Sequence, residues 1–264
     1  AGPRLLNPTS DGWIAEAVKH FRVVLPDQRG TGRSSRVDSH AMARLAAGGA
    51  RAQADYLKRF LADSIVRDFE HLRRTEFGGS PWVTLGQSYG GFLTLTYLSL
   101  FPEGVAASFT CGGIPHVPAN ATEVYEHTFP RMARKTAQFY ERYGVDADRV
   151  AAVADQLPTV AEIAEAGGIG GDSGSLPEGT PLLPNGDPLT VERLQCLGSD
   201  FGMKPSFERV HWIFDDAFVD GDGSVSAGAA LSDEFLAKVM NATSSRPLYW
   251  PLQEFIYANG ELDE

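Results

Sequence analysis

The sequence lacks the features of a membrane protein or of a protein stabilised by disulfides. None of its apolar runs reaches the roughly 18 residues that a membrane-spanning helix needs. Its N-terminus, AGPRLLNP, has no charged segment followed by an apolar one, so we expect no secretory signal peptide. The two cysteines, Cys111 and Cys196, favour a reduced protein. These absences predict a cytoplasmic location and no membrane partner.

Positive charge is also scarce, because the net charge of the chain is −11. This balance argues against nucleic acid and anionic membrane surfaces as partners. The charge is unevenly placed: residues 1–114 hold 13 Lys or Arg against 10 Asp or Glu, a net of +3, whereas residues 115–264 hold 10 against 24, a net of −14. The acidic part is either an ordinary solvated helical surface or a surface that attracts a cationic substrate.

Motifs for a metal or a phosphate-containing cofactor are missing as well. No cluster of Cys and His has the spacing of a zinc site. The glycine-rich segment DQRGTGRS (27–34) lacks the Lys-Ser/Thr ending of a phosphate-binding loop. We therefore expect neither a metal nor a cofactor.

Predicted strands and helices alternate in the first part of the chain. Short apolar, β-branched runs predict strands at 21–27, 81–86 and 105–113, with helical patterns at 52–76 and 90–101 between them. This alternation predicts an α/β fold with a parallel sheet. From Pro115 onward the patterns are mostly helical. We therefore predict two domains, an α/β core at 1–114 and a mostly helical subdomain at 115–264.

The segment GQSYG, Gly86–Gly90, has the pattern G-x-S-x-G between a predicted strand and a predicted helix. On such a turn the serine is held clear of the sheet, and the N–H of the next residue, Tyr89, points to where an oxyanion forms. Small residues at 86 and 90 would let strand and helix pack closely. We interpret Ser88 as a nucleophile; the alternative is an ordinary Gly/Ser turn.

Several segments resemble the proline iminopeptidase (prolyl aminopeptidase) branch of the α/β-hydrolases. The resemblance starts with DQRGTGRSS, DSIVRDFEHLR, WVTLGQSYGGFLTLTYLSLFPEGV and GGIP, in this order. LTVERLQCLGSDFG, FERVHWIFDDAF and LYWPLQEFIYANG resemble the helical cap of the larger members. The resemblance implies an α/β-hydrolase core with a helical cap. It also implies a serine exopeptidase that needs no cofactor and removes an N-terminal residue, preferentially proline, from a small peptide with a free N-terminus.

The resemblance also assigns roles to residues. Ser88 would attack the scissile carbonyl, and the Tyr89 N–H would be one oxyanion donor. Gly2 in AGPR would be the second donor, unless the real donor lies upstream of Ala1. Glu254 in LQEFIY and Asp215 in WIFDDAF would bind the substrate amine, although a glutamate is expected where Asp215 stands. A protonated amine in an apolar pocket needs such a carboxylate to offset its desolvation.

The sequence indicates no position for the Asp and His that would complete a catalytic triad with Ser88. In this fold the chain order is Ser, then Asp or Glu, then His. The histidines after Ser88 are His116, His127 and His211, and all fall in the predicted helical region or at its start. We therefore assign no triad Asp or His, and expect a core truncated at both ends that a missing segment or a second chain completes. The oligomeric state stays open.

Two other functions remain open at this point. The first is a capped esterase or amidase of the same fold that needs no free amine in its substrate. The second is an inactive fragment that lacks the Asp and His of the triad. Both keep the α/β-hydrolase fold and differ from the exopeptidase in what the site can recognise or activate.

Overall fold

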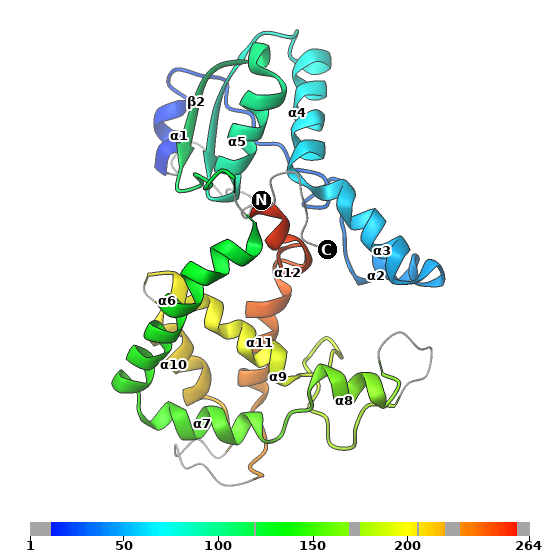
Figure 1. Cartoon of the computed structure of the whole chain (residues 1–264), viewed down its shortest axis with the longest axis vertical. Coiled ribbons are helices and arrows are strands. Elements are labelled where there is room, and N and C mark those ends of the chain that lie inside the picture. Colours follow the sequence, from blue (N-terminus) through cyan, green and yellow to red (C-terminus); the bar gives the residue numbers. More distant parts are fainter. Residues whose placement is uncertain (1–11, 119, 169–174, 205, 220–227, 258–264) are drawn as a thin grey trace. The chain divides into compact units, whose positions relative to one another are not determined.

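The computed structural model describes residues 12–118, 120–168, 175–204, 206–219 and 228–257 of the chain. The chain divides into two compact units. The first unit is Ala1–Ala121 with Leu248–Glu264, and the second is Thr122–Pro247. Figure 1 shows strands and helices in the first unit and helices in the second.

The first unit consists of helices around a pair of strands. Its α-helices are α1 (Gly12–Ala17), α2 (Ser39–Ala43), α3 (Gly49–Leu57), α4 (Ala62–Glu76), α5 (Tyr89–Leu100) and α12 (Tyr249–Leu252). Its 3-10 helices are η1 (Ala46–Gly48), η2 (Lys58–Phe60), η3 (Pro102–Gly104) and η5 (Glu254–Tyr257). The strands are β1 (Trp82–Gln87) and β2 (Val105–Cys111).

The two strands pair in parallel, with Thr84 opposite Ser108 and Gly86 opposite Thr110. Helix α5 connects them and packs against both strands and against α4 (Figure 1). Side-chain hydroxyls tie these elements together: Thr84 donates to Ser108 at 3.0 Å, and the hydroxyls of Thr94 and Thr110 lie 2.8 Å apart. This strand–helix–strand arrangement confirms the predicted α/β class for the first unit.

The predicted strand at 21–27 is not formed. Phe21 and Leu25 are 53% and 54% exposed, and the backbone of this segment is irregular. A strand is stable only when a neighbouring strand accepts and donates its hydrogen bonds. Among the described residues β1 and β2 alone form a sheet, so the apolar run at 21–27 has no partner strand. The prediction was wrong because composition does not supply a pairing partner.

The loop after this segment is fastened to helix α4 by one arginine. Nε and Nη2 of Arg29 donate to the two carboxylate oxygens of Asp68 at 2.6 and 2.5 Å. Nη1 of Arg29 donates to the carbonyl oxygen of Arg59 at 2.8 Å. Such a bidentate pair fixes direction as well as distance. The segment DQRGTGRS is therefore a structural loop.

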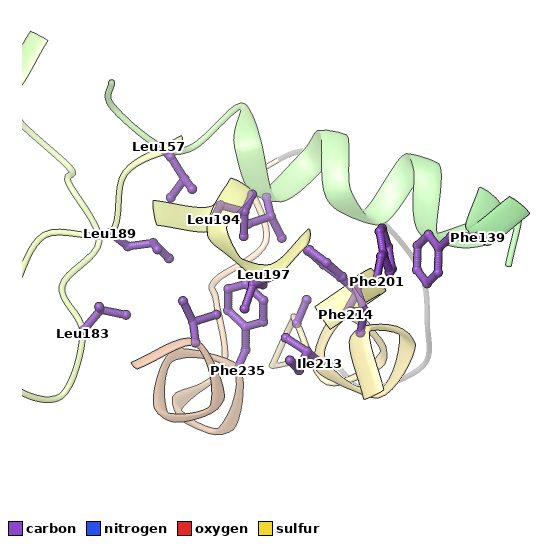
Figure 2. Close-up of a cluster of buried hydrophobic side chains, with 14 residues drawn as sticks. Phe139, Leu157, Leu183, Leu189, Leu194, Leu197, Phe201, Ile213, Phe214 and Phe235 are labelled. Atoms are coloured by element: carbon purple, nitrogen blue, oxygen red, sulfur yellow. The ribbon is translucent and has the colours of Figure 1, made fainter. Parts of the chain in front are cut away.

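The described residues of the second unit are mostly helical, as the patterns after Pro115 predicted, with loops between the helices. Its α-helices are α6 (Ala121–Arg142), α7 (Val145–Ala154), α8 (Val160–Glu165), α9 (Val191–Gln195), α10 (Phe207–Asp215) and α11 (Asp233–Ser244), with the 3-10 helix η4 (Cys196–Gly202). Buried side chains from these elements form one core, in which Phe139 lies 5.1 Å from Phe201 between ring centroids (Figure 2). None of the helices in the described part of the chain is long and apolar enough to cross a membrane.

The division into units differs from the predicted domains in its last part. The first boundary, after Ala121, falls near the predicted one after residue 114. The segment from Leu248 onward groups with the first unit, whereas the sequence placed it in the helical subdomain. Its contacts explain the difference, because Leu248 lies against Gly30 and Tyr257 packs on Phe92.

A buried carboxylate joins helices α4 and α5. Glu70 and Arg73 of α4 are 3% and 4% exposed, and two hydrogen bonds of 2.8 Å link them. The hydroxyl of Tyr97 on α5 donates to the same carboxylate at 2.8 Å, and Arg74 also pairs with it. Arg73 reaches further, to the carbonyl of Gly79. This network aligns α5 on α4 and satisfies its buried charges, as a buried carboxylate requires.

The network keeps Glu70 ionised. Its hydrogen bond with Arg73, helped by those from Tyr97 and Arg74, lowers the pKa of Glu70 to about 2, although burial alone would raise it. Burial and the hydrogen bond to Glu70 raise the pKa of Tyr97, which therefore stays a neutral donor. The charge of Glu70 is thus part of the folded structure at every pH above its depressed pKa.

Replacing Glu70 with Gln is expected to lower the free energy of unfolding at pH 7 by about 3 kcal/mol, because a pKa difference of one unit corresponds to about 1.4 kcal/mol. The folded-state pKa lies below the ordinary value of 4.5, so this contribution is present above pH 4.5 and is lost as the pH falls toward 2. Urea unfolding at pH 7 and at pH 3 measures it.

The exposed Glu76, on the same helix, provides the matched control. Glu76→Gln should change the unfolding free energy by less than about 0.5 kcal/mol at both pH values. Equal losses for the two variants, or a loss for Glu70→Gln that does not shrink at pH 3, would contradict the role given to the network.

Candidate active site

The backbone at Ser88 turns sharply from β1 into α5. Its φ of 56° and ψ of −121° make it the one residue other than glycine with positive φ in the described ranges. Such a conformation costs about 1–3 kcal/mol and persists only where the surroundings hold it. Two hydrogen bonds do so: the Ser88 N–H donates to the Cys111 carbonyl at 2.9 Å, and the Ser88 carbonyl accepts from the Gly91 N–H at 2.8 Å.

Close backbone packing around this turn requires glycine at three positions, one of which is Gly91, where a Cβ would lie 2.8 Å from the Cα and the carbonyl oxygen of Gly113. A Cβ at Gly86 would overlap the carbonyl oxygen of Gly90, and a Cβ at Gly113 would overlap the carbonyl oxygen of Ser88. The prediction for position 86 is therefore confirmed. The prediction for position 90 is wrong, because a Cβ at Gly90 would meet nothing within 4 Å. The role of Gly113, which lies in the segment GGIP, was not predicted from the sequence.

Ser88 is exposed, and its hydroxyl forms no hydrogen bond within the described residues. Tyr89 is the first residue of α5, so its N–H has no intrahelical acceptor and can donate to an oxyanion. The Tyr89 ring is largely buried, and this burial, with the charge of Asp63, raises the pKa of its phenol to about 12. Gly2, the candidate second donor, lies outside the described residues.

Glu254 lies in the first unit, which also contains Ser88. It is the exposed first residue of η5, whose last residue, Tyr257, contacts Phe92 of α5 edge to face at 6.1 Å between ring centroids. The structure therefore connects Glu254, through three residues of η5, with the helix that Ser88 begins. This contact places η5 against the helix that follows the candidate nucleophile.

Asp215 lies in the second unit, at the end of α10, and it has a positively charged partner there. Its Oδ1 accepts from Nη2 of Arg149 at 2.8 Å, and 38% of the Asp215 side chain is exposed. Arg149 in turn donates to the fully buried Asp146 at 3.0 Å. The sequence did not predict this arginine, which balances part of the charge that Asp215 would offer to an amine.

His211 completes the same group of side chains. Its Nδ1 lies 2.8 Å from Oδ2 of Asp146, and its ring stacks on Tyr143 at 4.1 Å between centroids. It is thus a partly buried histidine on a helix of the second unit, in the region where the sequence predicted helices. His116 and His127 are exposed. Within the described ranges no histidine forms a hydrogen bond with Ser88, and no group of His, Cys, Asp or Glu there could hold a metal ion.

The family that this chain matches in comparison with known proteins agrees with the geometry of the Ser88 turn. Residues 6–144, more than half of the chain, match the family described as the alpha/beta hydrolase fold. The chain belongs to the α/β-hydrolase fold family. The matched region contains the whole strand–helix–strand arrangement around Ser88, so the predicted fold class is confirmed for the residues that form the turn.

Two curated relatives are similar to this α/β-hydrolase over nearly its whole length. The proline iminopeptidase of Aeromonas sobria is 39% identical over 251 residues, which cover 94% of this chain and 52% of that protein. The proline iminopeptidase aneH of Aspergillus aculeatus is 28% identical over 261 residues, 96% of this chain and 52% of that protein. The chain therefore spans about half the length of the curated relatives it matches.

In this α/β-hydrolase, Gly86→Ala is expected to lower the free energy of unfolding by about 3 kcal/mol, because the added methyl group forces β1 and α5 apart. Gly90→Ala, in the same pentapeptide, should change it by less than about 1 kcal/mol, since space is free there and alanine favours helix. Urea unfolding of the full-length protein measures both. Equal stability of the two variants would contradict the packing described at Gly86.

Proposed function

We propose that this chain supplies the nucleophile of a serine exopeptidase that releases an N-terminal residue, preferentially proline, from small peptides. The observation that carries the proposal is the strained, exposed turn at Ser88 between β1 and α5. The proline iminopeptidases to which the chain is similar support the choice of substrate. Neither nucleic acid nor a membrane is proposed as a partner, and the cytoplasmic location stays a prediction.

In the proposed reaction the Ser88 hydroxyl attacks the carbonyl carbon of the first residue and passes its proton to a base. The Tyr89 N–H donates to the oxyanion that forms, and the amine of the shortened peptide leaves with a proton from the base. Water then hydrolyses the acyl-enzyme. We propose that the base, a histidine with its carboxylate, belongs to a segment outside these 264 residues or to a second chain.

Recognition of the free amine is proposed to depend on carboxylates. Glu254 is the better candidate, because it is exposed on a segment that packs on the helix of Ser88. Asp215 is the second candidate, and its ion pair with Arg149 offsets part of its charge. A carboxylate that meets the ammonium group would offset its desolvation and exclude blocked peptides.

A second candidate function is a capped esterase or amidase that needs no free amine. The observation that favours it is the same Arg149–Asp215 ion pair, because a carboxylate already balanced by an arginine attracts an ammonium group less strongly. This alternative keeps Ser88 as the nucleophile and changes only the selectivity of the site.

Ser88→Ala in the full-length protein is expected to reduce release of proline from a prolyl arylamide by at least about a thousandfold, because the acyl-enzyme can no longer form. A spectrophotometric assay of the released arylamine measures the rate. Retention of the rate would rule out Ser88 as the nucleophile.

A fluorophosphonate probe supplies the control for this variant, because it labels only an activated serine. Labelling of the full-length protein at Ser88, but not of Ser88→Ala, is expected. If the full-length protein is not labelled, the chain is part of an inactive hydrolase.

Glu254→Gln is expected to raise KM for a prolyl arylamide by about 10–100-fold with a smaller change in kcat, because a charge-assisted hydrogen bond contributes about 1.5–3 kcal/mol. Steady-state kinetics of the full-length variants measures both constants. Glu76→Gln, an exposed glutamate in the same unit, is the control. If N-acetylprolyl arylamide is cleaved as efficiently as the free-amine substrate, the esterase or amidase is the correct function.

A further inference from the structure

We propose that Tyr257 is a positioning residue, which holds Glu254 in a fixed relation to the helix that Ser88 begins. The inference rests on the proposed function and adds a residue that neither the sequence pattern nor the similarity to other proteins singles out. It depends on two short helical segments, α5 and η5, and on one contact between their side chains.

Phe92 lies near the start of helix α5. Ser88 is the N-cap of this helix, and Phe92 follows one turn later. Each residue of an α-helix advances the chain by about 1.5 Å along the axis. Phe92 therefore lies at the end of α5 that is next to the nucleophile.

Glu254 and Tyr257 belong to the same short helix, η5. Glu254 begins this 3-10 helix and Tyr257 ends it. In a 3-10 helix the side chains three residues apart eclipse one another. Glu254 and Tyr257 thus lie on one face of η5, and a contact that fixes Tyr257 also holds the backbone from which the Glu254 side chain projects.

The contact between the two segments is an aromatic pair. The rings of Phe92 and Tyr257 are 6.1 Å apart between centroids and are inclined at 75°, an edge-to-face arrangement. Pairs of this kind favour a defined ring orientation beyond simple burial. Both residues are partly buried, and burial, helped by the electrostatic interaction with Tyr249, raises the pKa of the Tyr257 phenol. The contact therefore involves the neutral ring of Tyr257.

The other end of the segment is also fixed in the first unit. Leu248, just before α12, lies over Gly30 near the Phe60 ring, where a side chain at position 30 would overlap it. Glu254 lies between this contact and the one at Tyr257. The backbone that carries this exposed carboxylate is therefore held at both ends, which limits how far the carboxylate can move from an incoming ammonium group.

The test compares Tyr257→Leu with Tyr257→Phe in the full-length protein. The ligands are two competitive inhibitors, prolinamide and its amine-free isostere cyclopentanecarboxamide. Tyr257→Leu should weaken prolinamide about tenfold and leave cyclopentanecarboxamide unchanged, whereas Tyr257→Phe should leave both unchanged because the ring contact remains. In prolyl arylamide turnover, Tyr257→Leu should raise KM more than it lowers kcat.

A merely structural role for Tyr257 gives a different pattern. Equal weakening of both inhibitors by Tyr257→Leu, or no weakening of prolinamide, overturns the proposal. Phe77→Leu is the matched control, because it removes an edge-to-face pair of similar geometry, with Trp82 at 5.5 Å and 77°, in the same unit. If Tyr257→Leu does not fold, Phe92→Leu removes the same contact from the other side, and the same inhibitor ratio decides.

The outcomes also separate this inference from the function on which it rests. If Glu254→Gln raises KM and Tyr257→Leu does not, the positioning role alone is wrong. If the full-length protein neither releases proline nor binds prolinamide, the proposed function is wrong, and the positioning role is overturned with it.

Discussion

The left-handed backbone at Ser88 is the constraint on which the first unit depends. It exposes the hydroxyl, and it is unfavourable unless neighbouring backbone holds it. The Cys111 carbonyl on β2 accepts from the Ser88 N–H, and Gly113, just after β2, allows the chain to pass the Ser88 carbonyl. The turn between β1 and α5 therefore requires β2 beside it. A conformation that is local in the sequence is stabilised by residues more than twenty positions away.

A buried ionic network between α4 and α5 also fixes the position of α5. Glu70 accepts from Arg73 on its own helix and from Tyr97 on α5, so an ionic group orients the helix that starts at Ser88. A buried carboxylate is costly unless all its partners are present. Here the network fixes the orientation of α5. Its hydrogen bonds are all formed in one alignment of α5 on α4, whereas a purely apolar contact would allow α5 to slide along α4.

The sequence predicts features that are local and fails where a distant partner decides. The strands at 81–86 and 105–113, the helix at 90–101 and the serine turn between them were all recognisable, since each is encoded within about a dozen residues. The run at 21–27 has the composition of a strand but no partner strand in the described chain. Arg149, which pairs with Asp215 from another helix, could not be found by pattern, because nothing near either residue indicates the other.

The two candidate carboxylates are not equivalent, and electrostatics explains why. In the second unit, the Arg149 guanidinium pairs with both Asp146 and Asp215 and so balances part of the charge of Asp215. Glu254 lies instead in the unit of the nucleophile, on a segment tied to α5 through Tyr257. A carboxylate that selects a free amine must keep its charge and its direction relative to the attacked carbonyl. The contacts of its segment, at Leu248 and Tyr257, hold the backbone that carries Glu254 within this unit, and we infer that Glu254 contributes more to selectivity than Asp215.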